Sequence, residues 1–474
     1  MRVAVLVVAL VLAGSALAAV PAGTIHGTGG PDRIDAVNGN RDVIRCGAGR
    51  DIVVADLKDA VNTDCEVLTR RIALDSATTL GSQHRTIVEP SAVGDGQTVV
   101  AVFQSARIVD GGAGAIGWVT SSDGGSTWRR GLLPDSGAAR VSDPAVARDR
   151  AHGLWIASVL AIVPGETRLL TYSSPDGFTW NAPVVAAAAA PLAREPIAFD
   201  KEWIACDNGP TSPRLGACYL AYTDVNGGNL GVRTSLDGGT TWSAAATIAT
   251  PGSSAPVGAI PTPTADGTVA VVYLAENIGT IDAATSVDGG VTFGAPVQVA
   301  VVALHTTPLR VPPLPSVALT TQGINVVWPD CSAHPGCTSN DIVLSTSSDG
   351  AVWRTPRVIA AGGDYVTPTI GAAGDSAAVL AYVRQPGVCC KLGVRLFRSS
   401  DGGTTWGPPA RLDAQPMDSA WFARSLVGFD TVGFLGDYTA VAFTDNRPIP
   451  VFAATHAPIA GSLRQDLYAT TRLP

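Results

Sequence analysis

Short apolar segments alternate with glycine-rich and proline-rich turns along most of the chain. Several stretches hold two such segments separated by a turn, and clear examples are 89–103 (EPSAVGDGQTVVAVF), 143–159 (DPAVARDRAHGLWIASV), 315–328 (PSVALTTQGINVVW) and 368–383 (PTIGAAGDSAAVLAYV). Apolar runs of this length between turn residues are typical of short strands joined by hairpins. The pattern predicts an all-β protein without long helices.

A second motif recurs after these strand pairs: a Ser-Asp-Gly turn that ends in an aromatic residue. It begins as SSDGGSTW at 121–128 and returns five times, with aspartates at Asp123, Asp176, Asp237, Asp288, Asp349 and Asp401. We expect the aspartate to accept hydrogen bonds from its own turn, glycine to supply positive φ, and the aromatic ring to pack between adjacent sheets. Spacings of 51 to 61 residues suit a four-stranded propeller blade.

The inner strand pairs number seven, because 425–445 adds one beyond the six turns. The stretch 465–474 then aligns with 340–349, which leaves the last blade one strand short. Segment 69–76 (TRRIALDS) is similar to 355–362 (TPRVIAAG), the expected strand after the fifth turn. It is therefore available to fill the open edge of the last blade. We therefore expect a seven-bladed β-propeller over 69–474, closed by an N-terminal strand, with a six-bladed ring as the alternative.

The six turns resemble Asp-boxes, the hairpin motif of sialidase-like and BNR-repeat propellers, and the resemblance spans about residues 85–410. It implies a propeller in which the box is a scaffold element on the outer rim, away from the central funnel. Sialidases themselves have six blades, so the seventh repeat departs from that family.

Residues 1–18 have the charge, apolar run and small-residue end of a secretory signal peptide, and we expect cleavage after Ala18 and export. No later stretch is long and apolar enough for a membrane span. Eight cysteines in an exported chain favour disulfides between near neighbours, with free buried thiols as the alternative. The expected pairs are Cys46 with Cys65, Cys206 with Cys218, Cys331 with Cys337, and Cys389 with Cys390. For the adjacent last pair, separate thiols are an equal alternative, since a bridge there requires a distorted peptide.

Residues 19–68 form a separate module with its own repeat of nine to ten residues, in which Asp32, Asp42 and Asp51 are in register. These copies resemble the RTX nonapeptide, which winds a parallel β-roll around calcium. The resemblance implies calcium binding by the three aspartates. The alternative is a small coil held by the Cys46–Cys65 bridge alone.

A net charge of −8 and the lack of a basic run argue against nucleic acid as a partner. We expect a monomer that binds a glycan or another polar extracellular ligand at the mouth formed by the starts of the innermost strands. Acidic residues precede proline there, and charged and aromatic residues cluster in 199–207 and 434–447. The candidate ligand-binding residues are Glu89, Asp143, Glu195, Asp200, Lys201, Trp203, Asp445 and Arg447. Alternatively, these acids cap strand ends and form a local salt-bridge knot.

The sialidase resemblance also implies a glycosidase alternative, with a tyrosine nucleophile activated by glutamate, an aspartate acid/base and three arginines. The residues that match these types are Tyr438, Glu202, Asp437 and Arg85. Arg85 stands in RTIVEP rather than in the family's R-I-P motif, and Arg194, Arg310 and Arg424 are further candidates. A third hypothesis is a protein-interaction scaffold at the cell surface. The six histidines are scattered and recommend neither a zinc site nor a catalytic triad.

Overall fold

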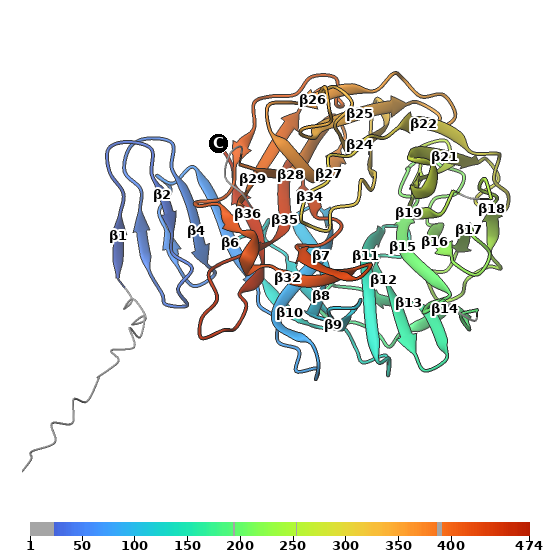
Figure 1. Ribbon diagram of the computed structural model, residues 1–474, viewed down its shortest axis with the longest axis horizontal. Helices are drawn as coiled ribbons and strands as arrows, with labels where there is room; N and C mark the ends of the chain where they lie inside the picture. The colour runs from blue at the N-terminus through green and yellow to red at the C-terminus, as the bar shows by residue number, and fades with distance from the viewer. Residues whose placement is uncertain (1–22, 193–194, 253, 386–390) are drawn as a thin grey trace, which may run out of the picture.

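The computed structural model describes residues 23–192, 195–252, 254–385 and 391–474 (Figure 1). Strands dominate these residues, and the two helical elements among them are single 3₁₀ turns, η1 (Glu276–Ile278) and η2 (Ser419–Trp421). The all-β prediction is confirmed.

Strand pairing divides most of the chain into four-stranded antiparallel blades, each built in sequence order from the innermost strand outwards. The first three blades are β7 (Gln83–Asp95), β8 (Thr98–Arg107), β9 (Ala113–Ser121) and β10 (Arg129–Leu132); β11 (Arg140–Asp149), β12 (Leu154–Val163), β13 (Glu166–Ser174) and β14 (Val184–Ala189); and β15 (Phe199–Cys206), β16 (Cys218–Asp224), β17 (Asn229–Ser235) and β18 (Ala246–Ile248).

The next three blades are β19 (Pro256–Pro263), β20 (Val269–Ala275), β21 (Thr280–Ser286) and β22 (Val297–Val301); β23 (Ser316–Thr320), β24 (Gly323–Asp330), β25 (Asp341–Ser347) and β26 (Arg357–Ala360); and β27 (Asp364–Ala373), β28 (Ser376–Arg384), β29 (Lys391–Ser399) and β30 (Ala410–Arg411), with β31 (Met417–Asp418) also on β29. A separate hairpin, β32 (Ala423–Val427) and β33 (Asp430–Phe434), follows them.

The seventh blade joins the two ends of the described chain. Its strands β34 (Ala440–Thr444), β35 (Arg447–Thr455) and β36 (Gln465–Arg472) are completed by β6 (Val67–Ala73), which pairs antiparallel with β36 so that Thr69 faces Thr470. The innermost strand β34 packs against both β27 and β7, which closes the ring visible in Figure 1. The chain is thus a seven-bladed propeller closed by the N-terminal strand.

The N-terminal module is a coil of short parallel strands. One side pairs β1 (Thr24–His26), β3 (Val43–Arg45) and β5 (Ala60–Val61), and the other pairs β2 (Arg33–Asp35), β4 (Ile52–Asp56) and β6. The strand β6 therefore belongs to both the coil and the seventh blade, and the predicted boundary after residue 68 falls inside it. The coil lies beside the ring, where it extends the sheet of blade seven (Figure 1).

The core lies between neighbouring blades, where apolar side chains of facing sheets form successive clusters. The recurring turns anchor the blade edges as expected. In the first, Ser121 Oγ donates to Asp123 Oδ1 at 2.8 Å, and the Thr127 backbone N–H donates to the same oxygen at 2.8 Å. Trp242 packs against the apolar cluster between the second and third blades and donates from Nε1 to Thr171 Oγ1 of the second blade at 3.2 Å.

Three of the four predicted disulfides are confirmed: Cys46–Cys65, Cys206–Cys218 and Cys331–Cys337. Cys389 and Cys390 lie outside the described residues, as does the predicted signal peptide. Within the described ranges, no helix has the length and apolar character needed to cross a membrane.

Candidate binding site in the central channel

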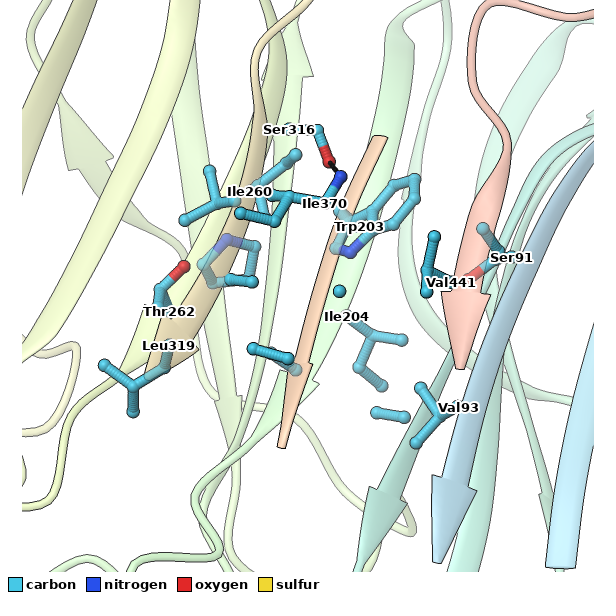
Figure 2. Close-up of a pocket in the computed structure, with 18 of the residues that line it drawn as sticks. Ser91, Val93, Trp203, Ile204, Ile260, Thr262, Ser316, Leu319, Ile370 and Val441 are labelled. Carbon is cyan, nitrogen blue, oxygen red and sulfur yellow. Dashed lines mark hydrogen bonds between the residues drawn. The ribbon is translucent and has the colours of Figure 1, made fainter. Parts of the chain in front are cut away.

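The seven innermost strands surround a central cavity of about 650 Å³. Its wall consists largely of small and branched apolar side chains, and Figure 2 shows Val93, Ile204, Ile260, Ile370 and Val441 among the residues that line it. One end of the cavity lies at the starts of the innermost strands. The other lies at the turns that lead to the second strand of each blade.

The first end is shaped by a bulge that recurs near the start of the innermost strands. Glu89, Asp143, Lys201 and Thr367 have positive φ of 54°, 47°, 48° and 51°, and Gly258 takes the same place with φ 67°. The pairing register shifts at each of these positions. A bulge re-aims the side chain it carries, and here three charged side chains meet.

Lys201 lies at the centre of this cluster. Its Nζ is 2.6 Å from Asp437 Oδ2, 3.2 Å from Asp143 Oδ1 and 3.4 Å from Glu89 Oε1. All four side chains are buried, with Lys201 9% exposed. Burial alone would lower the pKa of Lys201, but the three carboxylates outweigh it and raise the pKa well above its usual value. The three carboxylates therefore keep Lys201 charged, and its ammonium group forms an ion pair with each of them. We call Glu89, Asp143, Lys201 and Asp437 the ion cluster.

Arg310 adds a second positive charge to the ion cluster. Arg310, from the loop between β22 and β23, donates to Asp437 Oδ2 at 2.6 Å and to Asp437 Oδ1 at 3.1 Å. Burial raises the pKa of Asp437, yet Lys201 and Arg310 outweigh burial and hold it below its usual value. Gln104 donates to Glu89 and, at 3.1 Å, to Ser142 Oγ. Gln104 was not identified from the sequence as a site residue. The feature that could have marked it is a single amide side chain within the largely apolar strand 98–107.

The strand-start end of the cavity is covered by the β32–β33 hairpin. Ser425 Oγ of this hairpin accepts from Arg310 at 3.3 Å and from Arg107 at 3.4 Å. The Phe434 ring lies 5.0 Å and 4.8 Å from the same two guanidinium groups. Leu309 forms a parallel bridge to Gly433. The expectation of a ligand mouth at the strand starts is therefore corrected, because the hairpin and the loop around 309–310 close that end.

Two aromatic rings and an acid lie beneath the ion cluster. Trp203 and Tyr438 meet edge to face, with ring centroids 5.1 Å apart, and Tyr438 OH donates to the Pro144 carbonyl at 3.1 Å. Glu202 is 1% exposed, and within the described part of the chain neither of its carboxylate oxygens has a hydrogen-bond partner. Burial, followed by the charge of Asp143, raises the pKa of Glu202 well above its usual value. Burial thus favours the protonated form of Glu202 relative to an exposed glutamate.

Asp200 belongs to the same neighbourhood. Its Oδ1 accepts from the Lys201 backbone N–H at 3.0 Å. Burial and the charge of Asp143 raise the pKa of Asp200 to about 7, against the opposing effect of Lys201. The structure thus brings together Glu89, Asp143, Asp200, Lys201, Glu202, Trp203, Asp437 and Tyr438.

Four candidates lie elsewhere. Glu195 is exposed in the loop before β15. Lys201, at the bulge of β15, occupies the position beside Glu89 and Asp143 that was expected for Glu195. Arg85 is exposed, and its backbone N–H donates to Asp75. Burial raises the pKa of Asp466, and the positive charge of Arg85 partly offsets that rise.

Asp445 and Arg447 occupy the β34–β35 turn, at the opposite end of β34 from Asp437, and Arg447 donates to the Gly124 carbonyl there. Among the further arginines, Arg424 is exposed on β32, where Gln83 binds its backbone, and Arg194 lies outside the described residues.

The opposite end of the cavity is open. Arg150 is 56% exposed there, and Arg148 lies beside it. A smaller adjoining cavity of about 470 Å³ shares Gly94 and Arg150 and is also lined by Asp445. The channel is therefore accessible to solvent from this end.

The aspartates of the coil bind backbone rather than one another. Asp51 Oδ1 accepts from the Asp32 backbone N–H at 2.7 Å, and Asp42 Oδ1 accepts from Gly23 at 2.9 Å. Asp51 Oδ2 is buried without a partner among the described residues. Calcium prefers six to eight oxygen ligands, and the bonds of Asp51 Oδ1 and Asp42 Oδ1 to backbone N–H groups compete with that role. The geometry favours a coil held by hydrogen bonds and the Cys46–Cys65 bridge, and calcium binding stays a prediction.

No family model and no curated protein matches the chain. Solved structures that resemble it include a protein of unknown function from Dyadobacter fermentans (17% identity, TM-score 0.47, covering 70% of this chain and 98% of that one). Another is the Hadza microbial sialidase Hz136 (15% identity, TM-score 0.44, 70% and 67%). A third is an α-L-arabinofuranosidase from Fusarium graminearum (13% identity, TM-score 0.44, 86% and 97%). At these values the likeness assigns no function, and the fold rests on the strand pairing described above.

Proposed function

We propose that this protein is a binding propeller that holds a small molecule in its central channel. The observation that carries the proposal is the cavity of about 650 Å³ enclosed by all seven innermost strands and open at one end. Small-molecule sites span about 300–1,000 Å³ and are mostly apolar with a few polar groups. The channel has both properties.

The ion cluster supports binding rather than catalysis. Lys201 faces three carboxylates, and Arg310 makes a two-point contact with Asp437. Buried charges that satisfy one another in this way stabilise a fixed geometry and leave little capacity for a substrate. The cluster therefore acts as the closed floor of the channel.

The walls favour a ligand with an apolar body over a glycan. The hydroxyls that line the channel are partly used by the fold, because Ser91 Oγ accepts from the Val146 N–H and Ser316 Oγ from the Ile370 N–H, both at 3.1 Å. The second of these bonds is drawn in Figure 2. A glycan would meet few free hydrogen-bonding groups on these strands.

A neutral apolar fluorophore, N-phenyl-1-naphthylamine, tests the proposal directly. We expect saturable binding with enhanced fluorescence, and loss of that signal in Val93→Phe, which narrows the channel. The control is Val287→Phe, at a valine that is 83% exposed on a recurring turn. Equal binding by both variants, or no binding by the wild type, contradicts the proposal. A glycan panel run alongside reveals a carbohydrate ligand instead.

A second candidate, a sialidase-type glycosidase, is favoured by one observation: Tyr438, Glu202 and Asp437 lie in one neighbourhood. Three features weigh against it. Tyr438 OH donates to a backbone carbonyl, the ion cluster is covered, and Arg85 lies elsewhere.

We also propose that the protein acts outside the cytoplasm. The three disulfides support this, because such bonds persist in oxidising compartments. A reporter fusion carrying residues 1–30 tests export, and retention of the reporter in the cytoplasm contradicts it.

A further inference from the structure

The two ends of the channel differ in charge. Six charged residues line the cavity within the described chain, and four of them, Asp143, Lys201, Glu202 and Asp437, lie at the closed end. The two at the open end, Arg148 and Arg150, are both arginines. The mouth therefore presents cationic side chains on the lining of an otherwise apolar channel.

One carboxylate holds both arginines in place. Arg148 Nε donates to Asp95 Oδ2 at 2.8 Å, and Arg150 Nε donates to Asp95 Oδ1 at 3.0 Å. Burial raises the pKa of Asp95, but the two arginines outweigh it and lower the pKa, so Asp95 stays ionised. Two guanidinium groups share one negative charge, which leaves this group of three with one net positive charge.

Arg150 is the member that remains open to a ligand. The Arg148 side chain is 18% exposed, and its guanidinium lies 5.0 Å from the Trp155 ring centroid. The Arg150 side chain is 56% exposed and borders both the channel and the adjoining cavity.

Asn208 of the next blade holds the backbone around Arg150 in place through two hydrogen bonds. Asn208 Oδ1 accepts from the Arg150 backbone N–H at 2.9 Å, and Asn208 Nδ2 donates to the Arg148 carbonyl at 2.7 Å. The guanidinium is thus mounted on a rigid turn at the rim. Asp445, which lines the adjoining cavity, is already bound by Gln97.

We infer that the channel ligand is an amphiphilic anion, with an apolar body inside the channel and an anionic head group on Arg150 at the mouth. The apolar body fits the valine and isoleucine walls, and a planar guanidinium suits a carboxylate or a phosphate. This inference rests on the proposed binding function and names the ligand class for the same channel.

Displacement of N-phenyl-1-naphthylamine by four molecules with the same twelve-carbon chain tests it. These are dodecanoate, dodecyl phosphate, dodecanol and dodecylamine, each below its aggregation concentration. We expect one of the two anions to displace the fluorophore at roughly tenfold lower concentration than the amine or the alcohol, because a charge-assisted hydrogen bond is added. The better of the two anions identifies the head group.

The variant Arg150→Gln should abolish this preference and leave binding of the neutral fluorophore intact. Arg130→Gln, at an exposed arginine on the outer strand β10, is the matched control and should keep the preference. Arg150→Lys, which retains the charge, should keep part of it.

Two outcomes overturn this inference but leave the proposed binding function standing. The first is fluorophore binding without preference for an anion, and the second is a preference that survives Arg150→Gln. If the fluorophore does not bind at all, the proposed function itself fails. Unchanged melting temperatures of the variants show that a lost preference does not reflect unfolding.

Discussion

Lys201 Nζ lies 2.6 Å from Asp437 Oδ2, although the two residues are 236 positions apart in the sequence. The contact joins the third blade to the segment that leads into the seventh. Because both side chains are buried, the pair also seals one end of the central channel.

Replacing this lysine should be costly. Lys201→Met leaves Glu89, Asp143 and Asp437 close together without their shared cation, and removing one partner of a buried ion pair costs about 3–5 kcal/mol. Urea unfolding at pH 7 measures the loss. Lys391→Met, at an exposed lysine, is the control and should change the unfolding free energy little. A loss below about 1 kcal/mol, the scale of a surface ion pair, would show that the cluster is not a structural unit.

Glu202 should make the protein less stable as the pH rises. Its pKa lies well above the ordinary value of 4.5 because of burial. The folded state therefore keeps a proton that the unfolded state gives up. Stability from this group is complete below about pH 4.5 and is lost as the pH rises towards the folded pKa.

The variant Glu202→Gln removes that titration, because glutamine resembles the protonated acid in shape. Its melting temperature should match the wild type near pH 4.5 and exceed it increasingly up to pH 8. Glu276→Gln, at an exposed glutamate, should show no such trend. A wild type that gains stability relative to Glu202→Gln between pH 5 and 8 would contradict the prediction.

Sialoside hydrolysis should be undetectable. The Tyr438 hydroxyl donates to the Pro144 carbonyl, and its pKa is raised by burial and by neighbouring acids, so it is a poor nucleophile. A fluorogenic sialoside assay at several pH values measures the rate. Turnover that disappears in Tyr438→Phe and persists in Tyr273→Phe would establish the glycosidase instead.

Calcium removal should leave the coil intact. Its aspartates already accept backbone N–H groups, and the Cys46–Cys65 bridge closes one turn. Melting with a chelator and with added calcium should give the same temperature within about 0.5 °C, because 1 kcal/mol shifts the melting temperature of a chain of this length by about 1 °C. A larger calcium-dependent rise, absent in Asp51→Asn, would support the RTX-type site.

Local signals in the sequence were enough to predict the ring of blades and its recurring turns. The Ser-Asp-Gly turns and their spacing predicted the blades, and the likeness of 69–76 to a fourth strand predicted the partner of β36. These features depend on residues near one another in the chain or on comparison of one repeat with the next.

The site was predicted less completely because its geometry depends on bulges and long-range contacts. A shifted register placed Lys201, rather than Glu195, beside Glu89 and Asp143. Arg310 and the β32–β33 hairpin reach the cluster from irregular segments. No periodic pattern marks such contacts, so the sequence did not predict that these segments pack over the strand-start end of the channel.

The pairing of β6 with β36 has a consequence for how the molecule assembles. The Thr69 and Thr470 hydroxyls lie 2.9 Å apart across this pair and 401 positions apart in sequence. During synthesis, the early strand has no partner on this edge until β36 has emerged. A chaperone that shields that edge would be most needed just before the last strand arrives, and a chain truncated there would expose a surface prone to aggregation.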